Sequence, residues 1–194
     1  MAVQVLPRQK PKPLQKARIS GDELYRMPGI DHAELVQGEI VPMSPTGYLH
    51  GLIKIRMAAW LEAAARQGDQ GIVLGGEVGV YTRRNPDTVR AMEAAFISHA
   101  RMAQVQSRSY LDVAPELVVE VLSPGDSWQA VMSKLEEYFE IGVSTVWIVD
   151  PDRQVIYVYQ GVMQTRRLGV GDVLTAAGVL EGVEIEVAAL FAPV

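Results

Sequence analysis

Glu120 interrupts an otherwise apolar run of the chain, and Glu93 interrupts a second predicted strand. Glu120 lies within residues 117–122, and Glu93 lies within residues 89–98. An ionised carboxylate in such a segment is costly unless it is paired, hydrogen-bonded or bound to a cation. If the two segments are neighbouring strands, both carboxylates can converge near one edge of a sheet. Paired acidic oxygens suit Mg²⁺ or Mn²⁺, because these ions need few protein ligands and keep waters for chemistry.

Lys134 is the third residue whose side chain could take part in a reaction. It falls on the predicted helix that follows the strand of Glu120, at the border of the apolar face, so its ammonium could reach back over the strand end. A lysine beside a bound metal can orient or deprotonate an attacking water and counter the charge on a phosphoryl transition state. Simpler alternatives stay open: a solvated pair of Lys134 with Glu137 or Asp126, a buried ion pair with Glu120, or contact of Glu120 with an arginine or water.

The elements around Glu120 predict a βαβ unit. Residues 117–122 form a β-branched and aliphatic run closed by Ser123-Pro124-Gly125, which is typical of a strand buried on both faces. Residues 128–141 have apolar positions at helical spacing and end at Gly142, and residues 145–149 form another apolar strand. A strand, a helix and a strand in this order predict parallel strands joined by a right-handed crossover.

The remaining periodicity predicts a single α/β domain. The other expected elements, in chain order, are a short helix (21–27), a hairpin (33–36 and 39–43), a long helix (48–66), β-rich pieces (71–74 and 77–82), the strand of Glu93 (89–98), a strand paired with 145–149 (154–159) and a helical turn (187–191). Residues 99–114 read as irregular structure or a helical turn. The order of elements therefore predicts a central sheet flanked by helices.

Size and composition are those of a single globular domain. A chain of 194 residues, 48% apolar and 21% charged, suits one globular domain. No run approaches the roughly 18 apolar residues of a membrane-spanning helix, and the N-terminus has no signal-like apolar segment, so we expect a cytoplasmic protein without membrane contact. With no cysteine, thiolate metal sites and disulfides are excluded. The three histidines show no metal spacing, so any metal would be held mostly by oxygen.

Charge is distributed unevenly along the chain. Since the whole chain carries −5 and residues 1–19 carry +5, residues 20–194 carry −10. We expect a basic N-terminal tail, residues 1–19, and one domain, residues 20–194. The tail could track phosphates or serve as a solubilising segment, whereas the acidic body argues against a broad basic DNA-binding face. The basic residues of the tail are Arg8, Lys10, Lys12, Lys16 and Arg18.

Several motifs in chain order resemble the Uma-type family of putative restriction endonucleases, in the PD-(D/E)XK superfamily. The resemblance covers roughly residues 20–192, nearly everything but the tail. It rests on Glu34-Leu35-Val36-Gln37-Gly38-Glu39-Ile40, Met43-Ser44-Pro45 with His50, Val89-Arg90-Ala91-Met92-Glu93-Ala94-Ala95-Phe96-Ile97, Pro115-Glu116-Leu117-Val118-Val119-Glu120-Val121-Leu122-Ser123-Pro124, Asp126, Lys134 with Tyr138, Gly142-Val143, and Trp147-Ile148-Val149-Asp150-Pro151.

The resemblance implies a restriction-endonuclease-like fold, an α/β fold with a central mixed β-sheet flanked by helices and an αβββαβ core. It implies a Mg²⁺-dependent (or Mn²⁺-dependent) endonuclease that acts on DNA. Carried over by position, Glu93 and Glu120 bind the metal, the backbone carbonyl of Val121 is a further ligand, and Lys134 stands in for the catalytic lysine. Glu39 and His50 match positions that line the same cleft.

Three departures from the family pattern weigh on activity. Leu122 occupies the superfamily's usual lysine position, two residues after the second acid, and Ala130 replaces a frequent acid. Met92-Glu93 stands where the pattern has Pro-Asp, so the carboxylate is displaced by about one C–C bond, and misplacement on that scale can cost around 100-fold in rate. The alternative function is a catalytically weakened or inactive nuclease-fold module for binding or assembly. The glycine-punctuated β segments after Tyr157 could pair edge to edge, which makes a homodimer an expectation.

Overall fold

The computed structural model of the chain describes residues 18–30 and 32–193. Its strands are β1 (Ala33–Val36), β2 (Glu39–Pro42), β3 (Gly71–Arg83), β4 (Thr88–Ser98), β5 (Leu117–Val121), β6 (Thr145–Asp150), β7 (Val155–Gly161), β8 (Gln164–Gly169), β9 (Val173–Thr175) and β10 (Glu184–Glu186). Its helices are α1 (Gly21–Arg26), α2 (Tyr48–Gly68), α3 (His99–Met102), α4 (Trp128–Glu140) and α5 (Val187–Leu190). The predicted basic tail, residues 1–19, lies almost wholly outside the described residues.

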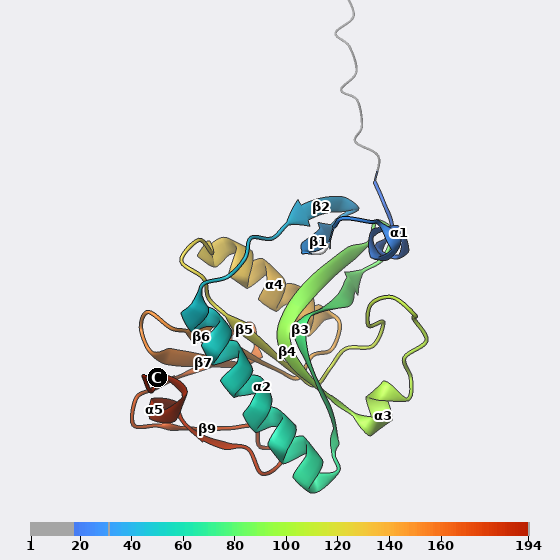
Figure 1. Ribbon diagram of the computed structural model, residues 1–194. Helices are drawn as coiled ribbons and strands as arrows, with labels where there is room; N and C mark the ends of the chain where they lie inside the picture. Colours follow the sequence, from blue (N-terminus) through green and yellow to red (C-terminus); the bar gives the residue numbers. More distant parts are fainter. Residues whose placement is uncertain (1–17, 31, 194) are drawn as a thin grey trace, which may run out of the picture.

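A mixed sheet forms the centre of the molecule (Figure 1). Its strands lie in the order β2-β1-β4-β5-β6-β7-β8, β3 also pairs with β4, and β9 and β10 form a separate two-stranded sheet. The predicted fold class is confirmed. The predicted hairpin is also confirmed, as β1 and β2 pair antiparallel.

The βαβ unit predicted around Glu120 is present. β5 and β6 are parallel, with Glu120 opposite Ile148, and α4 connects them. The side chain of Ser127 caps the first turn of α4 by accepting a hydrogen bond from the Ala130 N–H. Gly142, at φ 98°, follows the helix in the left-handed region that glycine adopts without a Cβ clash. This unit fixes the position of Lys134 relative to β5.

The strands that carry the two glutamates are neighbours, which is the condition under which the two carboxylates were expected to converge. β4 and β5 pair antiparallel, and Ala94, next to Glu93, lies opposite Val119, next to Glu120. β1 pairs with the same edge of β4 nearer its start, at Leu35 and Val89. Residues from β1, β4 and β5 therefore meet around one gap between β1 and β5.

The prediction of two separate β pieces at 71–74 and 77–82 is wrong, because both belong to the single strand β3. Between the pairs Gly75–Ala94 and Val78–Met92, β3 has two residues where β4 has only Glu93. This bulge lets one long strand bend without ending. It also places Glu77, at φ 67°, opposite Glu93.

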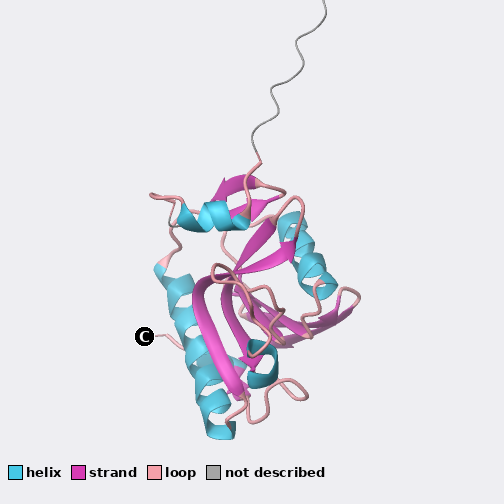
Figure 2. Cartoon of the chain, turned by 90° about the vertical axis from the view of Figure 1, so that its right-hand side faces the viewer, coloured by secondary structure: helices cyan, strands magenta, loops and turns pink. Residues whose placement is uncertain are grey.

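Helices cover both faces of the sheet (Figure 2). Ile53, Met57 and Leu61 of α2 pack on one face, and Leu135 and Tyr138 of α4 pack on the other. Side chains of β5 alternate accordingly: Leu117, Val119 and Val121 join the core beneath α2, and Val118 joins the core beneath α4. Glu120 shares the side of Val118, so the alternation directs it toward α4.

Among the described residues, no helix has the length and apolar character needed to cross a membrane.

Candidate active site

The Glu120 carboxylate is held by two residues of α4. Tyr138 donates a hydrogen bond from its hydroxyl to Glu120 Oε1 (2.5 Å), and Lys134 Nζ donates to Glu120 Oε2 (3.3 Å). Lys134 and Tyr138 are four residues apart and so lie on the same helix face. Glu120 is therefore not solvated at the strand end, and it has no arginine partner among the described residues.

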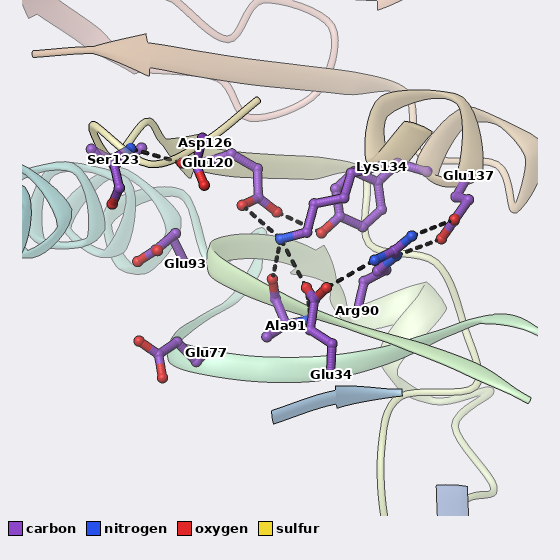
Figure 3. Close-up of polar contacts among 12 residues, drawn as sticks. Glu34, Glu77, Arg90, Ala91, Glu93, Glu120, Ser123, Asp126, Lys134 and Glu137 are labelled. Atoms are coloured by element: carbon purple, nitrogen blue, oxygen red, sulfur yellow. Dashed lines mark hydrogen bonds and ion pairs between the residues drawn. The ribbon is translucent and has the colours of Figure 1, made fainter. Parts of the chain in front are cut away.

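Lys134 has a second, closer carboxylate partner. Its Nζ lies 2.9 Å from Glu34 Oε1 on β1 and also donates a hydrogen bond to the main-chain carbonyl of Ala91 (3.3 Å). Figure 3 shows these contacts converging on one ammonium. The alternative in which Lys134 pairs with Glu137 or Asp126 is wrong: Glu137 binds Arg90, and Asp126 accepts a hydrogen bond from the Ser123 N–H.

Arg90, on β4, contacts two carboxylates, those of Glu34 and Glu137. Its guanidinium donates to Glu137 through Nε (2.7 Å) and Nη2 (2.6 Å), and to Glu34 through Nη1 (2.9 Å). The fork of a guanidinium fits such two-point contacts, which a lysine cannot reproduce. Glu34 thus lies between Arg90 and Lys134, and the Ala91 N–H also donates to it.

The two acids around Lys134, Glu34 and Glu120, have pKa values shifted in opposite directions. Burial alone would raise the pKa of Glu34, but Lys134 and Arg90 outweigh it and lower that pKa. Burial raises the pKa of Glu120 above its ordinary value, and Lys134 and Tyr138 only partly oppose this. Burial also disfavours charge on Lys134, yet Glu120 and Glu34 raise its pKa. Lys134 is therefore held as a cation between two carboxylates, of which Glu34 is the closer.

Glu93 faces the other helix. Its Oε1 lies 3.2 Å from His50 Nε2, and its Oε2 lies 3.0 Å from Lys54 Nζ, both on α2. His50 Nε2 also lies 2.9 Å from the Val121 carbonyl oxygen, to which it donates. Burial would raise the pKa of Glu93, but His50 and Lys54 lower it, and in turn Glu93 raises the pKa of His50. In Figure 3 the Glu93 carboxylate points away from Lys134, whereas that of Glu120 points toward it.

The predicted metal ligands form two adjoining groups. Glu93 and the Val121 carbonyl share His50 as a partner, and Glu120 belongs to the Lys134 group. A cavity of about 270 Å³ runs along the second group, and its lining includes Glu34, Arg90, Glu120, Val121, Lys134 and Tyr138. Glu39 is exposed on β2 and does not line this cavity, and neither does the buried His50.

The donor chemistry of this region fits a hard divalent cation. Glu93 Oε2 is buried and has the Lys54 ammonium 3.0 Å away, and a carboxylate oxygen can accept from more than one partner, so it can also bind a cation. Glu93 Oε1 and the Val121 carbonyl oxygen both approach one nitrogen, which shows that a carboxylate and a main-chain oxygen can meet at one point. Across residues 18–30 and 32–193, no cluster of three or more His, Asp or Glu side chains has metal-binding geometry. Magnesium tolerates such a sparse set because it retains water ligands.

Sequence reasoning missed four charged residues of the site as functional candidates: Glu34, Lys54, Glu77 and Arg90. Glu34 and Arg90 carried the same signal as Glu120, a charge inside a short apolar strand. Lys54 follows His50 by four residues, which places both on one face of α2. Glu77 gave no signal, because its position depends on the bulge in β3.

Comparisons with known proteins agree with the fold and the order of motifs. The family model Uma2, described as putative restriction endonuclease, matches residues 22–188. The crystal structure of a putative nuclease belonging to DUF820 from Anabaena variabilis ATCC 29413 is similar, with a TM-score of 0.74 and 17% sequence identity. The match covers 89% of this chain and 97% of that one. No match was found among the curated proteins.

Proposed function

Given that the chain belongs to the Uma2 family of putative restriction endonucleases, we propose that it is a Mg²⁺-dependent endonuclease that hydrolyses the phosphodiester bonds of DNA. The observation that carries the proposal is the contact of Lys134 Nζ with Glu120 Oε2 at the end of β5. It brings a lysine from the following helix to the acid that the superfamily pattern requires, although Leu122 fills the usual lysine position.

Glu93, Glu120 and the Val121 carbonyl are the proposed ligands of the ion. When bound, Mg²⁺ (or Mn²⁺) would polarise a phosphoryl oxygen and lower the pKa of a water. In hydrolysis the water oxygen bonds to phosphorus, the P–O ester bond breaks, and the leaving oxygen takes up a proton. Lys134 is a poor general base because its acidic neighbours raise its pKa. Its role is to hold the attacking water by hydrogen bonding and to offset negative charge in the transition state.

The first test is a Mn²⁺ titration followed by thermal unfolding, with wild type and Glu120→Gln compared. A ligand that binds only the folded chain raises the melting temperature. We expect a rise in the wild type that is lost or much reduced in Glu120→Gln. Plasmid cleavage in Mg²⁺ should be abolished by Lys134→Met, with circular dichroism to check that the variant is folded. Nicking by both variants at the wild-type rate would refute the assignment.

A specific observation favours a second candidate, an inactive module that binds or assembles without cleaving. Both oxygens of Glu93 already face cationic or hydrogen-bonding groups of α2, so internal charges could replace the ion. This candidate predicts no Mn²⁺ effect on unfolding and no cleavage by the wild type. A clear Mn²⁺-dependent rise in melting temperature would count against it.

Two further expectations belong to the proposal. A homodimer could form through strand pairing at the ends of the sheet, although exposed Arg166 and Arg167 on the terminal strand β8 disfavour that edge. The cytoplasmic location stays a prediction.

A further inference from the structure

Lys54 lies between two glutamates from neighbouring strands. Its Nζ donates a hydrogen bond to Glu77 Oε1 on β3 (3.2 Å) and lies 3.0 Å from Glu93 Oε2 on β4. Lys54 therefore bridges the two carboxylates. Lys54 is thus anchored by Glu77 and attracted by Glu93.

The position of Glu77 depends on an unusual backbone conformation. Its φ of 67° is left-handed, which for a residue other than glycine costs of order 1–3 kcal/mol and is most often retained at functional sites. One carboxylate oxygen of Glu77 contacts Lys54 on α2, and the other, Oε2, contacts Nδ1 of His32 (2.9 Å), which lies just before β1. Figure 3 shows Glu77 and Glu93 side by side, at the end of the site away from Arg90. Glu77 therefore holds Lys54 beside Glu93.

This arrangement leaves Lys54 with donor capacity. An ammonium has three N–H groups; one donates to Glu77, a second faces Glu93, and the third is left over. The side chain is 20% exposed, so the group is reachable from solvent. A divalent cation on Glu93 would take over the carboxylate that attracts Lys54, and Glu77 would still keep the ammonium beside the site. Its remaining N–H groups would then suit a negatively charged oxygen.

Building on the proposed nuclease function, we propose that Lys54 binds a non-bridging phosphate oxygen of the DNA next to Glu93, and that Glu77 is the positioning residue that holds Lys54 there. This gives the site a second lysine, on the helix opposite that of Lys134. Lys134 then lies beside Glu120, and Lys54 lies beside Glu93, the two proposed metal-binding carboxylates. The competing explanation is that Lys54 only neutralises Glu93 within the fold.

The test measures binding of a fluorescein-labelled DNA duplex by anisotropy in Ca²⁺, a cation of the same charge that also prefers oxygen ligands. Affinity is followed from about 50 to 200 mM salt, because each lost phosphate contact reduces the slope of log K against log salt by about one. Lys54→Met should show this loss, Lys54→Arg should restore the slope, and Glu77→Gln should lose part of it. Arg66→Met is the matched control: it removes one charge from the same helix, near its end, and should leave the slope unchanged.

The outcomes separate this inference from the function on which it rests. If wild type binds the duplex and Lys54→Met has the same slope, Lys54 does not contact phosphate, while the nuclease proposal stands. A lower melting temperature in Lys54→Met with an unchanged slope shows that Lys54 only neutralises charge. No binding by wild type in Ca²⁺ overturns both proposals. Lys54→Gln, which keeps a polar side chain, replaces Lys54→Met if the latter fails to fold.

Discussion

At the scale of single residues, the length of the Glu93 side chain decides which groups surround it. The carboxylate reaches His50 and Lys54 on α2, and these contacts use the methylene by which Glu exceeds the Asp of the family pattern. His50 and the Val121 carbonyl are arranged around this longer side chain. Glu93 is therefore adapted to its neighbours in this chain, and replacing it by the family residue would remove those contacts.

Glu93→Asp should lower cleavage activity, although it restores the family residue. The shorter side chain withdraws from His50 and Lys54, and misplacement on this scale costs about 10- to 100-fold in rate. Initial rates of plasmid nicking in Mg²⁺ test this, with Asp126→Glu as a control that also changes one methylene of a nearby acid. An activity equal to or above the wild-type value would show that the position of Glu93 is not adapted to α2.

Ionised Glu34 should make the free energy of unfolding depend on pH in the acidic range. Its pKa is lowered in the folded chain by Lys134 and Arg90, against the effect of burial. The ionised form therefore contributes stability above its unfolded pKa, and this contribution is lost as pH falls through the lower folded pKa. Glu34→Gln should cost about 3–5 kcal/mol at pH 7 because it leaves buried cations less well paired.

Urea unfolding measured from pH 7 to pH 3 tests whether the stability that Glu34 contributes falls as the pH falls. The stability difference between wild type and Glu34→Gln should shrink as the solution becomes more acidic. Glu62→Gln, on the exposed surface of α2, is the control and should not alter the pH profile. A difference that grows toward low pH would contradict the lowered pKa.

At the scale of elements, Arg90 joins three parts of the structure into one unit. It lies on β4 and contacts Glu34 on β1 and Glu137 on α4. Thr82 on β3 donates to Glu137 as well (2.8 Å). Lys134 lies one turn before Tyr138 on α4, so the placement of this helix determines where both side chains meet Glu120. The network therefore positions the site as well as stabilising the fold.

Arg90→Met should destabilise the chain strongly, by about 3–5 kcal/mol, because the buried carboxylate of Glu34 and the partly buried carboxylate of Glu137 lose a partner. Arg90→Lys should recover only part of this loss, since it cannot contact Glu137 at two points. Arg153→Met is the control: Arg153 pairs with Asp150 but is exposed, so its loss should have little effect. Urea unfolding measures all three, and equal stability of Arg90→Met and wild type would refute the role given to this network.

At the scale of the whole molecule, charge opposes DNA binding. The chain carries −5 although residues 1–19 contribute +5. Within the site, Lys54, Arg90 and Lys134 are all engaged by carboxylates. Long-range attraction of DNA would therefore depend on the N-terminal basic residues and on the divalent cation.

Deletion of residues 1–17 should weaken DNA binding and make it less sensitive to salt. The deletion removes Arg8, Lys10, Lys12 and Lys16, and each lost phosphate contact lowers the slope of log K against log salt by about 0.9. Anisotropy with the same labelled duplex measures the slope, and a full-length chain with these four residues changed to Gln separates charge from length. An unchanged slope would support a purely solubilising segment.

Sequence patterns predicted most of the fold and part of the site. The periodicity around Glu120 predicted the βαβ unit, because burial on both faces and helical spacing are local signals. It could not predict the bulge opposite Glu93, since bulges arise from the pairing of β3 with β4. For the same reason Lys54 was missed as a partner of Glu93, although His50 was a candidate: the face of a strand residue inverts when the register shifts. Lys134 was placed at the border of its helix face, but its closest acid, Glu34, comes from a strand far away in the sequence.

The end of the chain is fastened to the helix that carries His50 and Lys54. Arg56 Nη1 donates hydrogen bonds to the carbonyl of Leu190 (2.9 Å), the last residue of α5, and to that of Ala192 (2.7 Å), just beyond it. Arg56 lies two residues after Lys54 on α2, so this attachment helps to fix the turn of the helix that holds Lys54. Substitutions in and just after α5 can therefore alter the candidate site through Arg56, although they lie far from it in the sequence.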